Sequence, residues 1–165
     1  MKPLAYSIAQ RTLHWLTALL IFFNLLFPGR IERVTDQLAE GSVPAPQDWT
    51  SANLHIYTGF AIIGLTVLRL ILRAVQGAPD SPAEEPAFFR LASKVAHGLL
   101  YLLLFAMPVA GIAKFYLGVD FAGFLHAGPM KVALWTLVIA HVCGVLVHKF
   151  YWKTNVLDRM TRGVN

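Results

Sequence analysis

The sequence predicts an all-α integral membrane protein, a four-helix bundle that forms one domain over residues 1–165. Hydrophobic residues make up 56% of the chain and charged residues only 14%, a balance that does not fit a soluble domain. Four apolar stretches reach the roughly 20 residues that a helix needs to cross a hydrocarbon core about 30 Å thick. Together these observations predict four membrane-spanning helices, approximately at residues 8–27, 51–74, 88–117 and 130–152.

The first predicted span, residues 8–27, carries His14 one to two turns inside the membrane surface and ends at a Pro-Gly pair. It has no A-x-A cleavage site, and Trp15 lies near its start, so we interpret it as a retained helix rather than a signal peptide. The next stretch, residues 30–50, is polar with mixed charge and shows no strong helical period. We expect this stretch to be a surface connection.

The second span carries His55 near its start, and Gly59 follows one helical turn later on the same face. The missing side chain at Gly59 leaves room beside the imidazole for something broad and flat. Gly59 and Gly64 also suit close contact between helices, so both interpretations stay open. Arg69 and Arg73 end the span and are most simply topology determinants.

The third and fourth spans are associated with the remaining histidines. The third carries His97 and a mid-helix Pro108, which should bend it. In the fourth, His141 lies within the apolar part, where an ionisable side chain is costly and should face protein or a cofactor. His148 follows two turns later where lysines mark the membrane surface, and His126 stands just ahead of the span.

Lysine and arginine residues predict the orientation, because positively charged loops stay in the cytoplasm. One side of the membrane holds only four of them, Arg30, Arg33, Lys114 and Lys131. The side with the termini and the connection between the second and third spans holds Lys2, Arg11, Arg69, Arg73, Arg90, Lys94, Lys149, Lys153, Arg159 and Arg162. Both termini are therefore predicted to be cytoplasmic.

Four of the histidines then fall into two pairs at matching depths. His14 and His141 lie toward the cytoplasmic side of two different spans, whereas His55 and His126 lie near the opposite side. Two such pairs suit two haems, each held from both faces by imidazoles on different helices. Iron with both axial positions filled passes single electrons and does not bind oxygen at the metal. The pattern therefore predicts an electron wire across the membrane.

Other cofactors fit the sequence less well. Cys143 is the only cysteine, which excludes c-type attachment and a cysteine-held iron–sulfur cluster, so the predicted haems are held non-covalently. Zinc or copper needs three or four nitrogen or sulfur ligands at one point. A haem-free transporter or scaffold whose histidines relay protons is a further alternative, and the depth-matched pairs disfavour it.

His97 and His148 both lie near the predicted cytoplasmic surface, where plain interfacial histidines are common. The functional alternative is a quinone site, in which an imidazole hydrogen-bonds the ring and transfers protons as the quinone is reduced. Arg69 and Arg73 likewise have a second possible role, which is to pair with haem propionates.

Four motifs follow one another along the chain: Arg11-Thr12-Leu13-His14-Trp15-Leu16; His55-x-x-x-Gly59 with Arg69-Leu70 and Arg73; His97-x-x-x-Tyr101 with Pro108; and His141 to His148-Lys149-Phe150-Tyr151-Trp152. In order and depth they resemble the bacterial cytochrome b561 family, whose members include a superoxide oxidase that reduces ubiquinone. The resemblance covers nearly the whole chain and implies a multi-pass protein of the bacterial inner membrane.

The resemblance also implies a site assignment. One b haem would be held by His14 and His141 nearer the cytoplasm, and the second by His55 and the first histidine of the fourth segment. Electrons would be delivered to a quinone on the cytoplasmic side, where His148 matches a residue implicated in the family.

One spacing departs from the family pattern. His126 precedes His141 by fifteen residues, one more than is typical of the family, and Gly128-Pro129 lies between them. His126 must then be presented from a turn ahead of the helix or by a local bulge. Met130 lies on the same face as His141 and is an alternative ligand, which would give a His/Met site of raised potential. We favour His126.

The sequence leaves two redox functions open. In the first, an enzyme takes electrons from superoxide outside, passes them through two haems and reduces ubiquinone, which predicts a locally positive outer surface built from the four basic residues on that side. In the second, a cytochrome b anchor subunit passes electrons between a periplasmic redox partner and quinone, and residues 30–50 supply the docking face. Membrane lipid is a partner in both, and we expect no nucleic-acid partner.

Overall fold

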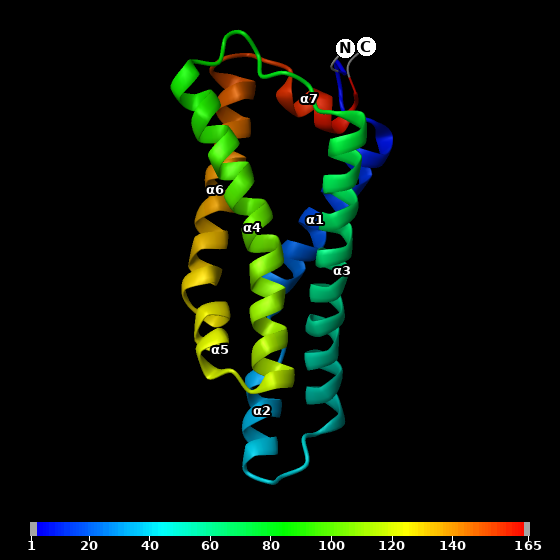
Figure 1. The fold of residues 1–165 in the computed structure, drawn as a ribbon, viewed down its shortest axis with the longest axis vertical. Helices are drawn as coiled ribbons and strands as arrows, with labels where there is room; N and C mark the ends of the chain where they lie inside the picture. Colours follow the sequence, from blue (N-terminus) through cyan, green and yellow to red (C-terminus); the bar gives the residue numbers. More distant parts are fainter. Residues whose placement is uncertain (1–2, 164–165) are drawn as a thin grey trace.

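The computed structural model describes residues 3–163 as helices joined by short connections, without a strand in that range. The helices are α1 (Ile8–Leu26), α2 (Ile31–Ala39), α3 (Pro46–Gln76), α4 (Ala87–Leu117), α5 (Asp120–Ala127), α6 (Pro129–Phe150) and α7 (Val156–Thr161). Figure 1 shows α1, α3, α4 and α6 side by side along the long axis of the molecule. The predicted all-α membrane bundle is confirmed.

The two ends of the bundle differ in the short helices that cover them. One end carries α2 and the junction of α4 with α5, and we call it the α2 end. The other end carries α7 and the connection between α3 and α4, and both ends of the described chain lie there (Figure 1). We call it the α7 end. Lys2, which contributed to the orientation argument, lies outside the described residues.

Three helical segments are long and apolar enough to cross a membrane by themselves: Pro46–Gln76, Ala87–Leu117 and Asp120–Phe150, the last combining α5 and α6. The fourth candidate is the pair α1 and α2, which meets the same criteria across a bend of 52°. By itself α1 has 19 residues, which at 1.5 Å per residue spans roughly 28 Å, close to the thickness of a hydrocarbon core. By length and composition, the described residues therefore contain up to four segments able to span a membrane, when the bent pair counts as one.

The first helix begins with a capping box. The Ser7 hydroxyl accepts a hydrogen bond from the backbone N–H of Gln10, and the Gln10 side chain accepts one from the backbone N–H of Ser7. Gln10 is buried and its amide also donates to the carbonyl oxygens of Leu72 and Gly77. The start of α1 is thereby attached to the end of α3 at the α7 end.

The expectation that residues 30–50 form only a surface connection is wrong. Helix α2 occupies Ile31–Ala39, and α3 begins at Pro46 rather than near residue 51. The apolar residues Ile31, Val34 and Leu38 recur at helical spacing, and Val34 is completely buried where α2 packs on α3. Pro46 occupies the first turn of α3, where its missing N–H costs nothing.

An ion pair between a buried carboxylate and an exposed arginine holds this end together. Asp48, in the first turn of α3, is 2% exposed and accepts a hydrogen bond of 2.8 Å from Arg30, which precedes α2. A carboxylate also interacts favourably with the N-terminal end of a helix. The ion pair fixes the start of α2 over the start of α3.

The region around Asp120, which connects the third and fourth spans, is helical. Helix α5 runs from Asp120 to Ala127, and Gly128 separates it from α6 with φ −107° and ψ −99°. Helix α4 ends just before, at Gly118, which adopts the left-handed conformation with φ 69°. The chain thus turns within a few residues and continues as a span with one irregular residue.

Helix α7 crosses the α7 end and was not expected from the sequence. The indole Nε1–H of Trp15 donates to the carbonyl oxygen of Met160, and Arg11 donates to that of Thr161. Arg159 donates to the carbonyl oxygen of Asp80 in the connection between α3 and α4. These bonds join the first turns of α1, the α3–α4 connection and the C-terminal helix.

Candidate functional site

The first histidine pair bridges α1 and α6 in the half of the bundle nearer the α7 end. The rings of His14 and His141 face each other with their centroids 6.2 Å apart and their planes at 55°. Both side chains are partly buried. Helix α1 packs mainly on α3, and α6 packs on α4 and α5, so the two imidazoles approach from opposite sides of the bundle.

Arg69 of α3 contacts this pair directly. Its Nη2 lies 3.0 Å from Nδ1 of His14, and its guanidinium lies over the ring of Tyr101, 5.5 Å from the ring centroid. An arginine only donates hydrogen bonds, so Nδ1 of His14 accepts here and the proton of the neutral ring is on Nε2. Binding of a metal through Nε2 would require that proton to leave and Arg69 to release Nδ1.

His97 of α4 also lies against His141. Their ring centroids are 5.1 Å apart with the planes nearly perpendicular, at 88°. The Nδ1–H of His97 donates to the carbonyl oxygen of Ser93 at 2.6 Å. His97 therefore lies beside the His14–His141 pair, and within residues 3–163 no ring contact joins it to His148.

The second histidine pair bridges α3 and α5 in the half nearer the α2 end. The centroids of His55 and His126 are 6.0 Å apart, with the planes at 75°. The Nδ1–H of His126 donates to the carbonyl oxygen of Met107 at 2.7 Å, which leaves Nε2 as the acceptor nitrogen of the neutral ring. Gly111 lies beside this ring, because a Cβ there would lie 3.2 Å from Cε1 of His126.

A cavity of about 880 Å³ adjoins the second pair. Both rings line it, and so does Gly59, where an added Cβ would meet no atom within 4 Å. The room beside His55 that the sequence predicts is therefore present. Met130, the alternative ligand, is not among the residues that line the cavity.

All four basic residues on this side of the bundle line the same cavity, namely Arg30, Arg33, Lys114 and Lys131. Three acidic residues, Glu32, Asp36 and Asp120, line it too. Arg30 pairs with Asp48 and Lys114 pairs with Asp120, whereas no ion pair within the described part of the chain involves Arg33 or Lys131. The expected clustering of basic residues is thus observed, with two of them already engaged.

The extra residue between His126 and His141 is accommodated at Gly128. The helix is interrupted at Gly128, the one irregular residue between α5 and α6. Pro129 then begins α6, in its first turn. His126 consequently stands on a short helix of its own, and its ring is directed to His55 despite the altered spacing.

Both pairs fit an iron bound between two imidazoles. With bonds of about 2 Å from metal to nitrogen, the two nitrogens lie about 4 Å apart, and the ring centres about 1 Å behind them, which gives a centroid separation of roughly 6 Å. The observed separations are 6.2 and 6.0 Å. In addition, Nδ1 of His55 is buried without a hydrogen-bond partner in the described chain, as expected of a ring whose surroundings are completed by another group.

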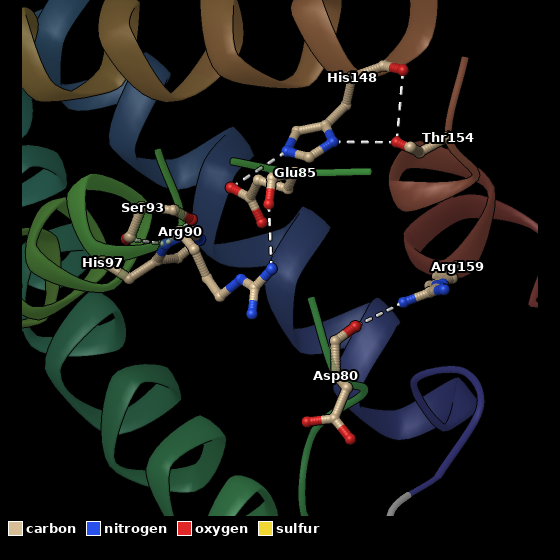
Figure 2. Close-up of polar contacts among 8 residues, drawn as sticks. All are labelled: Asp80, Glu85, Arg90, Ser93, His97, His148, Thr154 and Arg159. Atoms are coloured by element: carbon tan, nitrogen blue, oxygen red, sulfur yellow. Dashed lines mark hydrogen bonds and ion pairs between the residues drawn. The ribbon is translucent and has the colours of Figure 1, made fainter. Parts of the chain in front are cut away.

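His148 lies away from both pairs, in a cluster at the α7 end. It is buried at 9% exposure on the last turn of α6, with its Nε2 3.5 Å from Oε1 of Glu85 and its Nδ1 2.9 Å from Oγ1 of Thr154 (Figure 2). The ring of Trp152 packs edge-on at 4.8 Å. Sequence reasoning missed Glu85 and Thr154, because neither spacing nor composition indicates that a carboxylate in a proline-rich connection is buried.

Comparison with known proteins agrees with this arrangement. A family model described as prokaryotic cytochrome b561 matches residues 5–163, nearly the whole chain. The chain belongs to the prokaryotic cytochrome b561 family. It is therefore a multi-pass membrane electron carrier, and membership of the family implies binding of b-type haem.

Three relatives align over almost their full lengths. Cytochrome b562 of Cereibacter sphaeroides is 32% identical, over 95% of this chain and 95% of the relative. Cytochrome b561 homolog 2 of Escherichia coli is 26% identical, over 96% and 92%. A protein of Yersinia pestis named probable superoxide oxidase CybB is 27% identical, over 94% of both chains.

Proposed function

We propose that this cytochrome b561 family member carries single electrons across the bacterial inner membrane through two b haems, from superoxide at the α2 end to ubiquinone at the α7 end. The observation that carries the proposal is the pair of imidazole couples, each spaced for one iron, in the two halves of the bundle. His14 with His141 would hold one haem, and His55 with His126 the other. When bound, haem supplies a reversible one-electron couple.

The chain's own residues have distinct tasks in this proposal. The Met107 carbonyl orients His126 by accepting its Nδ1–H, as backbone carbonyls do for metal-bound histidines. Arg69 would exchange its bond to His14 for a haem propionate, which suits the planar guanidinium.

The donor assignment rests on the cavity at the α2 end. Superoxide is an anion, and Arg33 and Lys131 line a cavity that also reaches both rings of the second pair. Such basic residues raise the local concentration of an anion and its rate of arrival. The relative of Yersinia pestis whose name includes superoxide oxidase supports the same donor.

The acceptor assignment rests on the α7 end. His97 lies against His141, and His148 is buried in a polar cluster near the membrane surface. Imidazoles in these positions suit a quinone, which needs hydrogen bonds to its oxygens and protons during reduction. The excess of basic residues at this end predicts that it faces the cytoplasm together with both termini.

A reduced-minus-oxidised visible spectrum with haem quantified per chain tests the proposal, for the wild type, His141→Ala and His126→Ala. We expect about two b haems in the wild type and the loss of a different one in each variant. Superoxide-driven reduction of ubiquinone is then assayed with the purified wild type. One haem that survives His126→Ala would remove the α2-end site, and a need for an added periplasmic redox protein would favour the anchor subunit.

A further inference from the structure

Glu85 is a buried carboxylate in the connection between α3 and α4, with 4% of its surface exposed. Its Oε1 lies 3.5 Å from Nε2 of His148, which is itself buried (Figure 2). Burying a carboxylate is costly unless it is protonated or paired with a charge. The pair therefore holds either a proton on the carboxyl group or a carboxylate next to a protonated ring.

Glu85 and His148 lie at ion-pair distance, with 3.5 Å between Oε1 and Nε2. The Thr154 hydroxyl donates to the backbone carbonyl oxygen of His148 at 3.3 Å, so its oxygen accepts from the Nδ1–H of His148 at 2.9 Å. Oε1 and Nε2 then avoid facing each other with two lone pairs only when one of them carries a proton. A proton on either side chain is therefore within reach of the other.

Thr154 connects this pair to the surface. It lines a cavity of about 540 Å³ at the α7 end, together with residues of the α3–α4 connection and of the segment that leads into α7. Arg159 closes one side of this cavity by donating to the carbonyl oxygen of Asp80 at 2.7 Å (Figure 2). A hydroxyl both donates and accepts hydrogen bonds. The Thr154 hydroxyl donates to the carbonyl oxygen of His148, and when it turns from that oxygen it can pass a proton from water in the cavity to Nδ1 of His148.

Arg90 supplies an unused donor in the same place. Its Nη2 donates to the backbone carbonyl oxygen of Glu85 at 3.0 Å (Figure 2). Its Nε is buried without a hydrogen-bond partner in the described chain. An unpartnered donor and a proton-bearing pair on adjoining segments suit a ligand with a carbonyl oxygen that first accepts a hydrogen bond and then a proton.

We propose that Glu85 and His148 form the proton-delivering group for quinone reduction and that Thr154 reloads it from the cavity at the α7 end. This inference rests on the proposed function. Reduction of a quinone to a quinol takes two electrons, which arrive singly by way of the haems, and two protons. For each proton, the N–H or O–H bond of the pair breaks and an O–H bond forms on a quinone oxygen. The pair then regains a proton from water through Thr154.

The test uses haem-loaded protein reduced with dithionite and freed of excess reductant, and follows haem oxidation by two oxidants. Ferricyanide accepts an electron without a proton, whereas a short-chain ubiquinone needs both. For Glu85→Gln we expect an unchanged rate with ferricyanide and a rate with ubiquinone that falls on the order of 100-fold, the lower end of what general acid catalysis contributes. Glu85→Asp should recover part of the rate, and Thr154→Val should also slow only the ubiquinone reaction.

Asp158→Asn is the matched control, because it removes an exposed carboxylate at the same end of the molecule. It should leave both rates unchanged. If the Glu85→Gln protein binds less haem, the rates of the wild type are compared with those of Glu85→Asp and Thr154→Val instead. Equal ubiquinone rates in the wild type and in these variants at every pH would overturn the inference.

A second readout does not depend on turnover. In 15N NMR of the reduced protein labelled at histidine, the ring nitrogen signals of His148 should change in Glu85→Gln, because Nε2 loses its carboxylate partner, and stay in place in Asp158→Asn. Unchanged ring signals in Glu85→Gln would show that Glu85 and His148 exchange no proton. The proposed function fails in a different way, namely when ferricyanide oxidises the wild-type haems and no ubiquinone does.

Discussion

At the α2 end, His126 donates its Nδ1 hydrogen to the backbone carbonyl of Met107, whereas at the α7 end Nδ1 of His14 accepts a bond from the charged Arg69. The α2-end pair adjoins a cavity of about 880 Å³ that is lined by four basic and three acidic residues. The α7-end pair has a third imidazole, that of His97, packed against it. Two pairs with nearly the same ring spacing thus have different surroundings.

The difference teaches that ring spacing and ring environment set separate properties. Spacing decides whether an iron fits between two imidazoles, and it is alike at both ends. Hydrogen-bond partners and nearby charges set ligand basicity, redox potential and access. For the proposed electron wire, the pair beside the cavity suits collection of electrons from a small anion.

The largest effect is expected when one histidine of a pair is removed. His14→Ala should lose the same haem as His141→Ala, and His55→Ala the same haem as His126→Ala, because each iron needs both of its imidazoles. Visible spectra and haem quantification of the four variants measure this. Loss of one and the same haem in His14→Ala and His126→Ala would show that the histidines pair in another way.

A smaller effect is expected when a charge at the cavity of the α2 end is reversed. Lys131→Glu places a negative charge at the cavity of the α2 end, so the rate of haem reduction by superoxide should fall by roughly tenfold at low salt. The loss should shrink at high salt, since the screening length falls from about 10 Å at 0.1 M to about 3 Å at 1 M.

Stopped-flow measurement of haem reduction at several salt concentrations checks the charge effect. Lys149→Glu, at the α7 end, is the control and should leave the rate unchanged. An equal loss in both variants would mean that net charge, rather than the cavity, governs the reaction.

The smallest effect concerns the α7-end pair alone. Arg69→Gln removes a positive charge beside His14, which favours ferric over ferrous iron, so the potential of that haem should fall on the order of tens of millivolts. A redox titration followed in the visible spectrum measures it. Arg73→Gln, one turn further along α3, should change the potential less, and a shift confined to the other haem would contradict the assignment.

Much of the bundle was predictable because membrane spans are defined by local composition. The apolar stretches, the depths of His14, His55, His126 and His141 and the family resemblance all come from the linear order of residues. Helix α2 was missed although Ile31, Val34 and Leu38 have helical spacing. Its polar background and the nearby prolines suggested a loop, but Pro46 occupies a first helical turn where it is tolerated.

The sequence by itself determined the fold class, the four spans and which histidines could meet, since hydrophobic length and depth in a membrane depend on residues near one another in the chain. Only the tertiary structure decided the groups around them. The approach of Arg69 to His14, of His97 to His141 and of Glu85 to His148 joins segments far apart in sequence. Such contacts depend on how the helices and their connections pack, and a linear pattern does not contain that information.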